Sequence, residues 1–333
     1  MTLGVLSSCT AVVGSSQHVA INDGVIETVA LDLLKSPEPP GWDADLHFRA
    51  ENDEHTAMWL LALDALNFCF WGQGDDPSVR WRVRWKNELV DGYVALVAAL
   101  TKAMETEVPL HSAQWLADVS ANDVAAILAP EEGHTEIPLF DNRVSNLREL
   151  GRGLLPYGAN PASTFISAAD GSAVNLVRNI VETFPSFNDV TVWPYANTSL
   201  PENEVRFYKR AQILVGDIAG GLAGSPLAEF HDLEQLTAFA DYKVPQILRE
   251  LGVLEYDDHL AALVDNRHRI PAGSREEVEI RAATIVACDR FVQAMRQRVR
   301  DITAGQLDWH LWSLSQHMPA GSRPYHLTET IFY

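Results

Sequence analysis

Cysteine is scarce in this sequence, and no stretch of it stays apolar for the length of a membrane span. The three cysteines, Cys9, Cys69 and Cys288, lie far apart and form no C-x-x-C pair. This spacing indicates neither a disulfide framework nor a zinc site. The opening MTLGVLSSCTAVVGSS has no positively charged stretch of the kind that begins a secretory signal. We therefore expect a protein of the reducing cytoplasm that does not associate with a membrane.

Positive charge is also in short supply. The 333 residues include 25 Lys and Arg against 45 Asp and Glu, and the formal net charge is -20. Such a surface repels phosphate backbones and disfavours binding to duplex nucleic acid, although a local basic pocket can still hold a small anion. Hydrophobic residues make up 47% of the chain, which is ample for a soluble globular core. The expected partner is a small molecule, and the expected state is a monomer.

Most standard chemical signatures are missing as well. The glycine-rich stretch GDIAGGLAGSP (216–226) matches neither the phosphate-binding loop nor the dinucleotide fingerprint, and it follows a predicted helix rather than a strand. The chain contains no H-E-x-x-H zinc motif and no G-x-S-x-G nucleophile elbow. We therefore expect neither a metal nor a cofactor. Catalysis by a carboxylate and an amine is the chemistry that remains.

Helical patterns dominate what is present. The stretch 54–70 is almost continuously apolar and predicts a buried helix, whereas WRVRWKNEL (81–89) alternates and predicts a short strand. Further helices are predicted over 91–108, 120–129, 142–155, 175–187, 205–222, 232–240, 244–254 and 274–302. At the start of the last, Ser274 and Glu277 form a capping-box pattern. The fold class is therefore mainly α, a single domain with few short strands, in which residues 1–40 are of uncertain structure and 41–333 form the main body.

The stretch DALNFCFWG (64–72) combines an asparagine with aromatic residues at the end of the predicted helix 54–70. Phe and Trp dominate protein cores, so a buried aromatic cluster is one interpretation. Asn67 favours a second interpretation, a binding site, because a buried amide is costly without hydrogen-bond partners. An amide beside aromatic rings is also suited to binding a flat heterocycle, with the faces on the rings and the edge on the amide.

Two further stretches place charges inside apolar sequence. Lys209 and Arg210 interrupt the run 205–217, where a solvent-facing helix surface is the default interpretation. Asp241 precedes a predicted helix with Pro245 in its first turn, an arrangement typical of an N-terminal cap. A cap and a catalytic carboxylate are compatible, because capping fixes the side chain. From the residues alone, both interpretations stay open.

Longer blocks of the chain resemble a known family. The likeness to the queuosine salvage proteins, the queuosine 5'-phosphate N-glycosylase/hydrolase family, runs in order from about residue 40 to the C-terminus through LDALNFCFWG, DGYVALVAALTKAME, RFYKRAQILVGD, LTAFADYKVPQILRELGVLEY, EEVEIRAATIVACDR and PYHLTETIFY. The resemblance implies an all-helical fold similar to helix-hairpin-helix DNA glycosylases. It also implies release of the base queuine, a 7-deazaguanine, from the nucleoside monophosphate by hydrolysis without a metal. The family's catalytic lysine and aspartate fall on Lys209 and Asp241.

These roles fit the chemistry of N-glycosidic cleavage, which builds positive charge on the sugar C1'. The Asp241 carboxylate would stabilise or attack that carbon. Lys209 would keep Asp241 ionised, orient water, or donate to the leaving group or the sugar, and these roles stay open. For substrate binding we expect Asn67, Phe70 and Trp71 on the base, Tyr208 and Tyr242 beside the catalytic pair, and His47 and His326 at the sugar-phosphate.

Two other functions stay open from the sequence. The fold resemblance includes DNA glycosylases, but the net charge of -20 without a basic patch argues against a surface for duplex DNA. A non-catalytic module that binds a modified nucleoside is the second alternative, with Lys209 and Asp241 as a structural ion pair. Release of free queuine from queuosine 5'-phosphate distinguishes the three.

Overall fold

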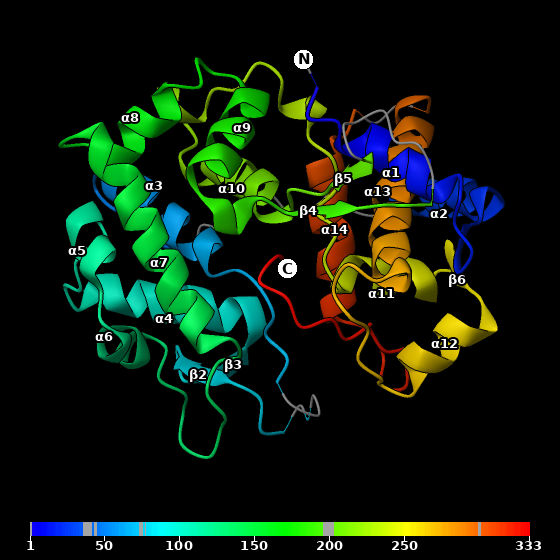
Figure 1. Cartoon of the computed structure of the whole chain (residues 1–333), viewed down its shortest axis with the longest axis horizontal. Coiled ribbons are helices and arrows are strands. Elements are labelled where there is room, and N and C mark those ends of the chain that lie inside the picture. Colours follow the sequence, from blue (N-terminus) through cyan, green and yellow to red (C-terminus); the bar gives the residue numbers. More distant parts are fainter. Residues whose placement is uncertain are drawn as a thin grey trace.

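The computed structural model describes residues 2–35, 42, 45–72, 76, 78–195, 203–298 and 301–333. These residues are mainly helical, which confirms the predicted fold class (Figure 1). The α-helices are α1 (Val5–Val13), α2 (Asp23–Lys35), α3 (Asp53–Ala65), α4 (Gly92–Glu105), α5 (Ala113–Asp118), α6 (Ala121–Ile127), α7 (Phe140–Leu154), α8 (Pro161–Ser167), α9 (Ala173–Thr183), α10 (Lys209–Gly221), α11 (Lys243–Glu250), α12 (Asp258–Asp265), α13 (Arg275–Arg296) and α14 (Ala304–Gln316). Short 3-10 turns are η2 (Leu155–Tyr157), η3 (Pro185–Phe187), η5 (Pro226–Ala228) and η6 (Leu233–Gln235). The likeness to helix-hairpin-helix glycosylases stays a prediction.

The strands of the described residues form three small antiparallel pairs. They are β1 (Val19–Ile21) with β6 (Leu254–Tyr256), β2 (Arg82–Trp85) with β3 (Glu88–Asp91), and β4 (Val190–Val192) with β5 (Glu204–Arg206). The second pair is a hairpin, so the single short strand predicted over 81–89 is wrong, because the chain reverses direction within it. Its two turn residues, Lys86 and Asn87, both have positive φ, 45° and 69°, as a two-residue hairpin turn requires.

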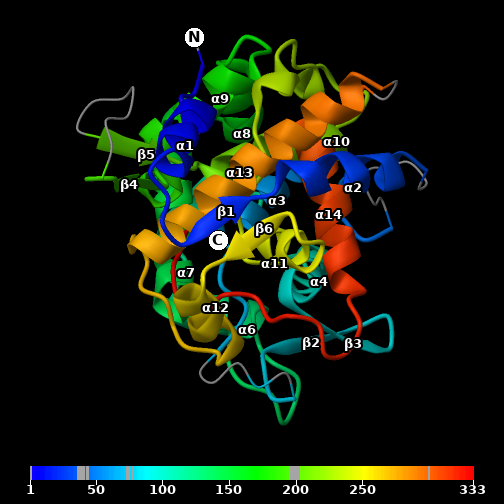
Figure 2. The same ribbon diagram turned by 90° about the vertical axis from the view of Figure 1, so that its right-hand side faces the viewer.

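The helices fall into two groups with the C-terminal segment between them (Figure 1). Helices α3 to α10 form the first group, and α1, α2 and α11 to α14 form the second. The described residues form two main hydrophobic cores, one in each group, and the core of the first group extends to α1, whose Val5, Cys9 and Val12 belong to it. Helix α13 lies between the cores: Val278 and Ala282 belong to the first, Ile280 and Ala283 to the second. Because α13 is apolar on both faces, it is buried along most of its length, and Figure 2 shows it running diagonally across the molecule.

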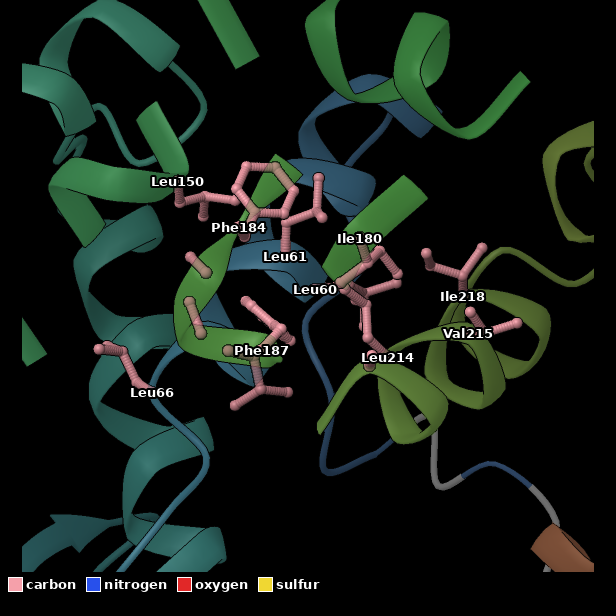
Figure 3. Close-up of a cluster of buried hydrophobic side chains, with 14 of the residues drawn as sticks. Leu60, Leu61, Leu66, Leu150, Ile180, Phe184, Phe187, Leu214, Val215 and Ile218 are labelled. Carbon is pink, nitrogen blue, oxygen red and sulfur yellow. The ribbon is translucent and has the colours of Figure 1, made fainter. Parts of the chain in front are cut away.

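The core of the first group fixes the two helices that carry most of the candidate site. Helices α3 and α10 pack directly against each other, and α3 also packs against α7 and α10 against α9 (Figure 3). The side chains that fill this contact include Leu60, Leu61, Leu150, Ile180, Phe184, Leu214, Val215 and Ile218. Burial of such side chains contributes roughly 1.5–3 kcal/mol each. The C-terminal end of α3 and the N-terminal half of α10 are thereby held in a fixed relation.

Three helix predictions need correction. Helix α3 ends at Ala65 rather than running to residue 70, and α10 begins at Lys209 because 204–206 pair as β5. The helix predicted over 232–240 is wrong, since only the short turn η6 forms there. Side chains of other helices accept hydrogen bonds from backbone N–H groups of this stretch. Gln212 accepts from Thr237 N–H at 2.9 Å, and Asp308 accepts from Phe239 N–H at 2.8 Å. These partners stabilise an extended backbone that the local pattern does not predict.

Residues 2–35 are structured, although the sequence left them uncertain. Helix α1 packs along α13, and β1 pairs with β6. The division into residues 1–40 and a domain over 41–333 stays a prediction. In the part of the chain that the structure describes, no helix has both the length and the apolar character needed to cross a bilayer.

Candidate functional site

Lys209 and Asp241 both lie at the beginning of helices. Lys209 is the first residue of α10, directly after Tyr208, whose left-handed backbone (φ 50°) turns the chain into the helix. Asp241 lies just before α11, and its Oδ1 accepts the backbone N–H groups of Lys243 and Val244, each at 2.8 Å. The capping contact predicted for Asp241 is therefore confirmed, and it holds the carboxylate in one orientation.

The Lys209 ammonium and the Asp241 carboxylate are buried and influence each other. Lys209 is 5% exposed and Asp241 is 9% exposed. Burial lowers the pKa of Lys209, and Asp241 is the strongest influence in the opposite direction. Burial raises the pKa of Asp241, and Lys209 is the strongest influence that lowers it. Within the described residues no protein group accepts a hydrogen bond from Lys209 Nζ, so the ammonium is available to a ligand or to water.

Three further carboxyl groups surround Lys209, and sequence reasoning missed them. Asp64 at the end of α3 and Asp308 on α14 both raise the pKa of Lys209. Asp217, two turns along α10, is coupled to Lys209 by charge as well. Burial raises the pKa of Asp64 to about 6 and those of Asp217 and Asp308 well above the usual range. The site therefore contains more acidic groups than positive charges, and burial opposes the ionisation of these carboxyl groups.

Two buried arginines hold the segment that follows α3. Arg143 donates to the carbonyls of Leu66, Phe68 and Cys69, the last two at 2.6 and 2.9 Å. Arg210 donates to the carbonyls of Asp64 and Ala65 at 3.0 and 2.8 Å. Cations at a helix C-terminus satisfy its free carbonyls and complement its dipole.

The default interpretation of Lys209 and Arg210 as a solvent-facing surface is accordingly wrong. Arg210 is 1% exposed, and Lys209 beside it is nearly as buried. Arg210 positions the end of α3, whereas the Lys209 ammonium has no comparable structural contact in the described residues. The two adjacent cations therefore differ in role: one anchors backbone carbonyls, and the other faces the carboxyl groups.

A buried ion pair connects the segments that carry Lys209 and Asp241. Arg281 of α13 donates to both oxygens of Asp189, one at 3.0 Å, and its Nε donates to the carbonyl of Ala240 at 3.2 Å. Asp189 Oδ2 also accepts the backbone N–H of Lys209 at 3.4 Å. A single guanidinium thus anchors the residue before Asp241 and, through Asp189, the first residue of α10. Arg281 is a positioning residue for both.

Glu277 completes the surroundings of Arg281. The Glu277 carboxylate lies 3.4 Å from Arg281 Nη1 and accepts a hydrogen bond from the Tyr333 hydroxyl at 2.9 Å. It also accepts the backbone N–H of Gly273 at 3.0 Å, while the Ser274 side chain caps α13 by accepting from Glu277 N–H. The predicted capping box therefore forms only in its Ser274 half, because the Glu277 side chain is directed to Gly273 and Arg281.

The residues predicted to bind the base lie around the segment after α3. Asn67 donates from Nδ2 to Asp64 Oδ1 at 3.1 Å, and its carbonyl oxygen accepts no hydrogen bond within the described residues. Phe70 belongs to the first core and stacks on Trp81 at 6.5 Å. Trp71 is 2% exposed and packs in a small cluster that includes Tyr242. Asn67 thus lies beside the Asp64 carboxyl group, whereas Phe70 packs in the core. Base binding by Asn67, Phe70 and Trp71 stays a prediction.

The remaining predicted binding residues are dispersed. Tyr242 lies close enough to Asp241 for the carboxylate to raise its pKa. Tyr208 instead lines a cavity of about 440 Å³ together with Arg178 and Arg206. His47 Nε2 lies 2.9 Å from the Tyr93 hydroxyl, and the His47 ring stacks on Trp42 at 3.9 Å. Tyr242 thus lies beside Asp241, as predicted, whereas Tyr208 lines a different surface.

His326 lies in the network of Arg281. Its Nε2 is 3.2 Å from the Tyr333 hydroxyl. Burial lowers the pKa of His326 to about 3, and Arg281 lowers it further, so the ring is neutral at physiological pH. A neutral imidazole offers no positive charge to a phosphate. A sugar-phosphate role for His326 stays a prediction that this environment does not favour.

Comparison with known proteins places the chain in a family. The family model described as "Queuosine salvage protein" matches residues 46–333. A protein of Sphaerobacter thermophilus named queuosine 5'-phosphate N-glycosylase/hydrolase is 46% identical over 99% of this chain and 98% of its own length. The chain belongs to the queuosine salvage protein family. Proteins of the same name from Nematostella vectensis and Bos taurus are 34% and 31% identical, over 87% and 96% of this chain and 85% and 95% of their own lengths.

The region shared with the queuosine salvage family contains the whole candidate site. Lys209, Asp241 and the three additional carboxyl groups all lie within residues 46–333. No cluster of three or more His, Cys, Asp or Glu side chains in the described ranges is arranged to hold a metal ion. The sequence did contain a signal for helix α14 and its Asp308: Thr303 and Gln306 form a complete capping box before an apolar run.

Proposed function

We propose that this chain hydrolyses the N-glycosidic bond of queuosine 5'-phosphate and releases queuine. The observation that carries the proposal is the buried pair of Lys209 and Asp241 in a member of the queuosine salvage family, with an ammonium that no protein group of the described residues binds. The named relatives from three different organisms support the same reaction and substrate. The cytoplasmic location, the monomeric state and action without nucleic acid, all expected from the sequence, are part of this proposal.

Asp241 is suited to stabilise the positive charge that develops on the sugar. Its Oδ1 is occupied by two backbone N–H groups, whereas its Oδ2 accepts no hydrogen bond within the described residues. The capped oxygen fixes the carboxylate, and the second oxygen is free to face the C1' carbon. A preorganised charge of this kind needs no reorganisation as the oxocarbenium-like transition state forms.

Lys209 and Asn67 are suited to the departing base. A 7-deazapurine has carbon in place of N7, so the leaving group needs hydrogen bonds to its other polar atoms. The free Lys209 ammonium supplies a donor, and the free carbonyl oxygen of Asn67 supplies an acceptor for base N–H groups. Asn67 is held by Asp64, so its acceptor is presented in a fixed direction.

The direct test is to incubate the purified protein with queuosine 5'-phosphate and to measure free queuine and ribose 5-phosphate by mass spectrometry. The proposal expects both products in equal amounts, and it expects far slower release of both from an Asp241→Asn variant. Binding of the nucleotide without any product would instead favour the non-catalytic module. Release of a base from duplex DNA, with none from the nucleotide, would favour the DNA glycosylase alternative.

The pH dependence of the reaction tests the contact between Lys209 and Asp241. Asp241 acts as the anion, so activity falls when pH drops through the pKa of Asp241. Because the Lys209 ammonium lowers that pKa, Lys209→Met should raise it and move the acid limb of the remaining kcat/KM to higher pH, by roughly 1 unit. Lys243→Met is the matched control, since Lys243 influences Asp241 least among its neighbours and should move the limb less. An acid limb that stays in place after loss of Lys209 would show that the two groups are not coupled.

A further inference from the structure

Tyr333 contacts two parts of the molecule that lie far apart in the sequence. It is 2% exposed and belongs to the segment 323–333, which lies between the two groups of helices (Figure 1). Its carbonyl oxygen accepts a hydrogen bond from the backbone N–H of Cys69 at 2.8 Å. Its hydroxyl donates to Glu277 Oε1 on α13 at 2.9 Å. One residue thus connects the segment after α3 to the helix that lies between the two cores.

The contact with Cys69 fixes a strained turn in the segment 67–71, which contains the residues expected to bind the base. Cys69 has a left-handed backbone with φ 38°, which is unfavourable for a residue other than glycine and persists where the surroundings hold it. Arg143 holds the Cys69 carbonyl at 2.9 Å, and Tyr333 holds the Cys69 N–H. The Arg143 contact lies within the first group of helices, whereas the Tyr333 contact leads out of it to α13.

The contact with Glu277 leads to the catalytic pair. The Glu277 carboxylate lies 3.4 Å from Arg281 Nη1, and the Arg281 guanidinium lies over the Tyr333 ring at 4.4 Å. Arg281 in turn anchors the residue before Asp241 and, through Asp189, the first residue of α10. The Tyr333 side chain therefore contacts the same guanidinium and carboxylate that hold the catalytic segments in place.

Other residues of the segment 323–333 contact the same two parts. The Tyr325 ring packs against the Tyr242 ring, at the start of α11, with a centroid distance of 4.9 Å. Leu327 packs in the small cluster with Phe68 and Trp71. The segment thus lies beside both the base-binding side and the catalytic side, and Tyr333 supplies hydrogen bonds to each.

We infer that Tyr333 is a positioning residue that fixes the segment 67–71 relative to Asp241. The inference deepens the proposed function and rests on it for the catalytic readout. The N-glycosidic bond joins the base to the sugar, so the groups that bind the base must be fixed relative to the carboxylate that faces C1'. Asp241 caps α11 of the second group, whereas the segment 67–71 follows α3 of the first group. Small displacements between such groups lower the rate strongly, because catalysis depends on their mutual orientation.

The test is Tyr333→Phe, which removes the hydroxyl and keeps the ring beside Arg281. We expect kcat for queuine release from queuosine 5'-phosphate to fall about tenfold, because the two parts lose their hydrogen-bonded connection. The Kd of free queuine, measured by calorimetry, should stay nearly the same. Free queuine contacts only the segment 67–71, which Arg143 still holds, whereas the nucleotide spans both parts.

Two control variants separate this role from a loss of stability. Tyr157→Phe removes a tyrosine hydroxyl at η2, where the ring packs on Phe165, and should change neither kcat nor Kd. Glu54→Ala removes the carboxylate that accepts the N–H groups of Ala162 and Ser163 at the start of α8, so it should lower the melting temperature and leave kcat of the folded protein in place. An unchanged kcat in Tyr333→Phe, or an equal loss of kcat in Glu54→Ala, would overturn the inference. A weakened Kd for queuine that accounts for the whole effect would also overturn it, because Tyr333 would then shape the base pocket alone.

Amide hydrogen exchange gives a readout that does not depend on turnover. Tyr333→Phe should speed exchange in the peptide 66–72, because its connection to α13 is lost, and Tyr157→Phe should not. Faster exchange near residues 239–242 without any change in 66–72 would show that the hydroxyl acts through Arg281 alone and would overturn the connection. Faster exchange in 66–72, together with a wild type that releases no queuine, would support the connection and overturn the proposed function.

Discussion

Replacing Asp241 by asparagine should abolish most queuine release and leave the protein folded. The asparagine Oδ1 can still accept the backbone N–H groups of Lys243 and Val244, so the start of α11 remains capped. What the variant loses is the negative charge that faces the sugar C1'. Loss of a preorganised electrostatic group lowers kcat by roughly 10²–10³-fold, which single-turnover measurements with queuosine 5'-phosphate would detect.

Asp241→Ala separates the two roles of this side chain. Alanine removes the charge and the cap together, so it should lose the same turnover and, in addition, about 1 kcal/mol of the free energy of unfolding. Lys243→Met serves as the neighbouring control, because its ammonium binds Gln246 at 2.9 Å and its backbone N–H is retained. An Asp241→Asn variant with a near-normal rate, or equal losses at Lys243 and Asp241, would contradict the assignment.

The sequence predicted the fold best where apolar spacing alone decides the structure. Helices α7 and α13 follow their hydrophobic pattern, and α3 follows it as far as Ala65, whereas the single strand predicted over 81–89 is a hairpin that turns at Lys86 and Asn87. The stretch 232–240 could not be predicted in the same way. Its backbone N–H groups bind the side chains of Gln212 and Asp308, which lie on two other helices, and such contacts are invisible to a local pattern.

The candidate site also contains residues that could be predicted from the sequence and residues that could not. Lys209 and Asp241 were found through family resemblance, and the cap at Asp241 through its local pattern. Asp64 and Asp217 lie within stretches that the sequence analysis singled out, 64–72 and 205–217. A single carboxylate in an apolar helix does not indicate a site, because the local sequence does not show which groups it faces. Their relation arises from the packing of α3 on α10, which only the three-dimensional structure shows.

The aromatic residues show that residue type alone does not distinguish a core position from a binding-site position. Phe70 and Trp71 are adjacent in the sequence, yet Phe70 packs in the first core and Trp71 in the small cluster with Tyr242. The same residue types serve a core and a binding pocket, because both bury apolar area. Arg210 is the opposite case. The sequence pattern predicted a solvent-exposed side chain, but Arg210 is almost fully buried, because it donates hydrogen bonds to the last carbonyls of α3.

Arg281 is expected to be the residue whose loss destabilises the protein most. Its side chain and that of its partner Asp189 are each 3% exposed, as is the Glu277 carboxylate on its other side. The guanidinium also stacks between the rings of Phe207 and Tyr333, at 3.9 and 4.4 Å. Removing it leaves two buried carboxylates without their cation.

Arg281→Met keeps much of the side-chain volume and removes the charge, so it should cost about 3–5 kcal/mol of the free energy of unfolding, measured by urea denaturation. Arg290→Met is the matched control on the same helix, because its ion pair with Asp23 is solvent-exposed and worth about 0–1 kcal/mol. Adding Asp189→Asn to Arg281→Met should recover part of the loss, since one uncompensated charge disappears. The folded fraction of Arg281→Met should also have a lower kcat, because the anchors of Lys209 and Asp241 are gone. Equal destabilisation by the Arg281 and Arg290 variants would show that the buried network does not hold these segments.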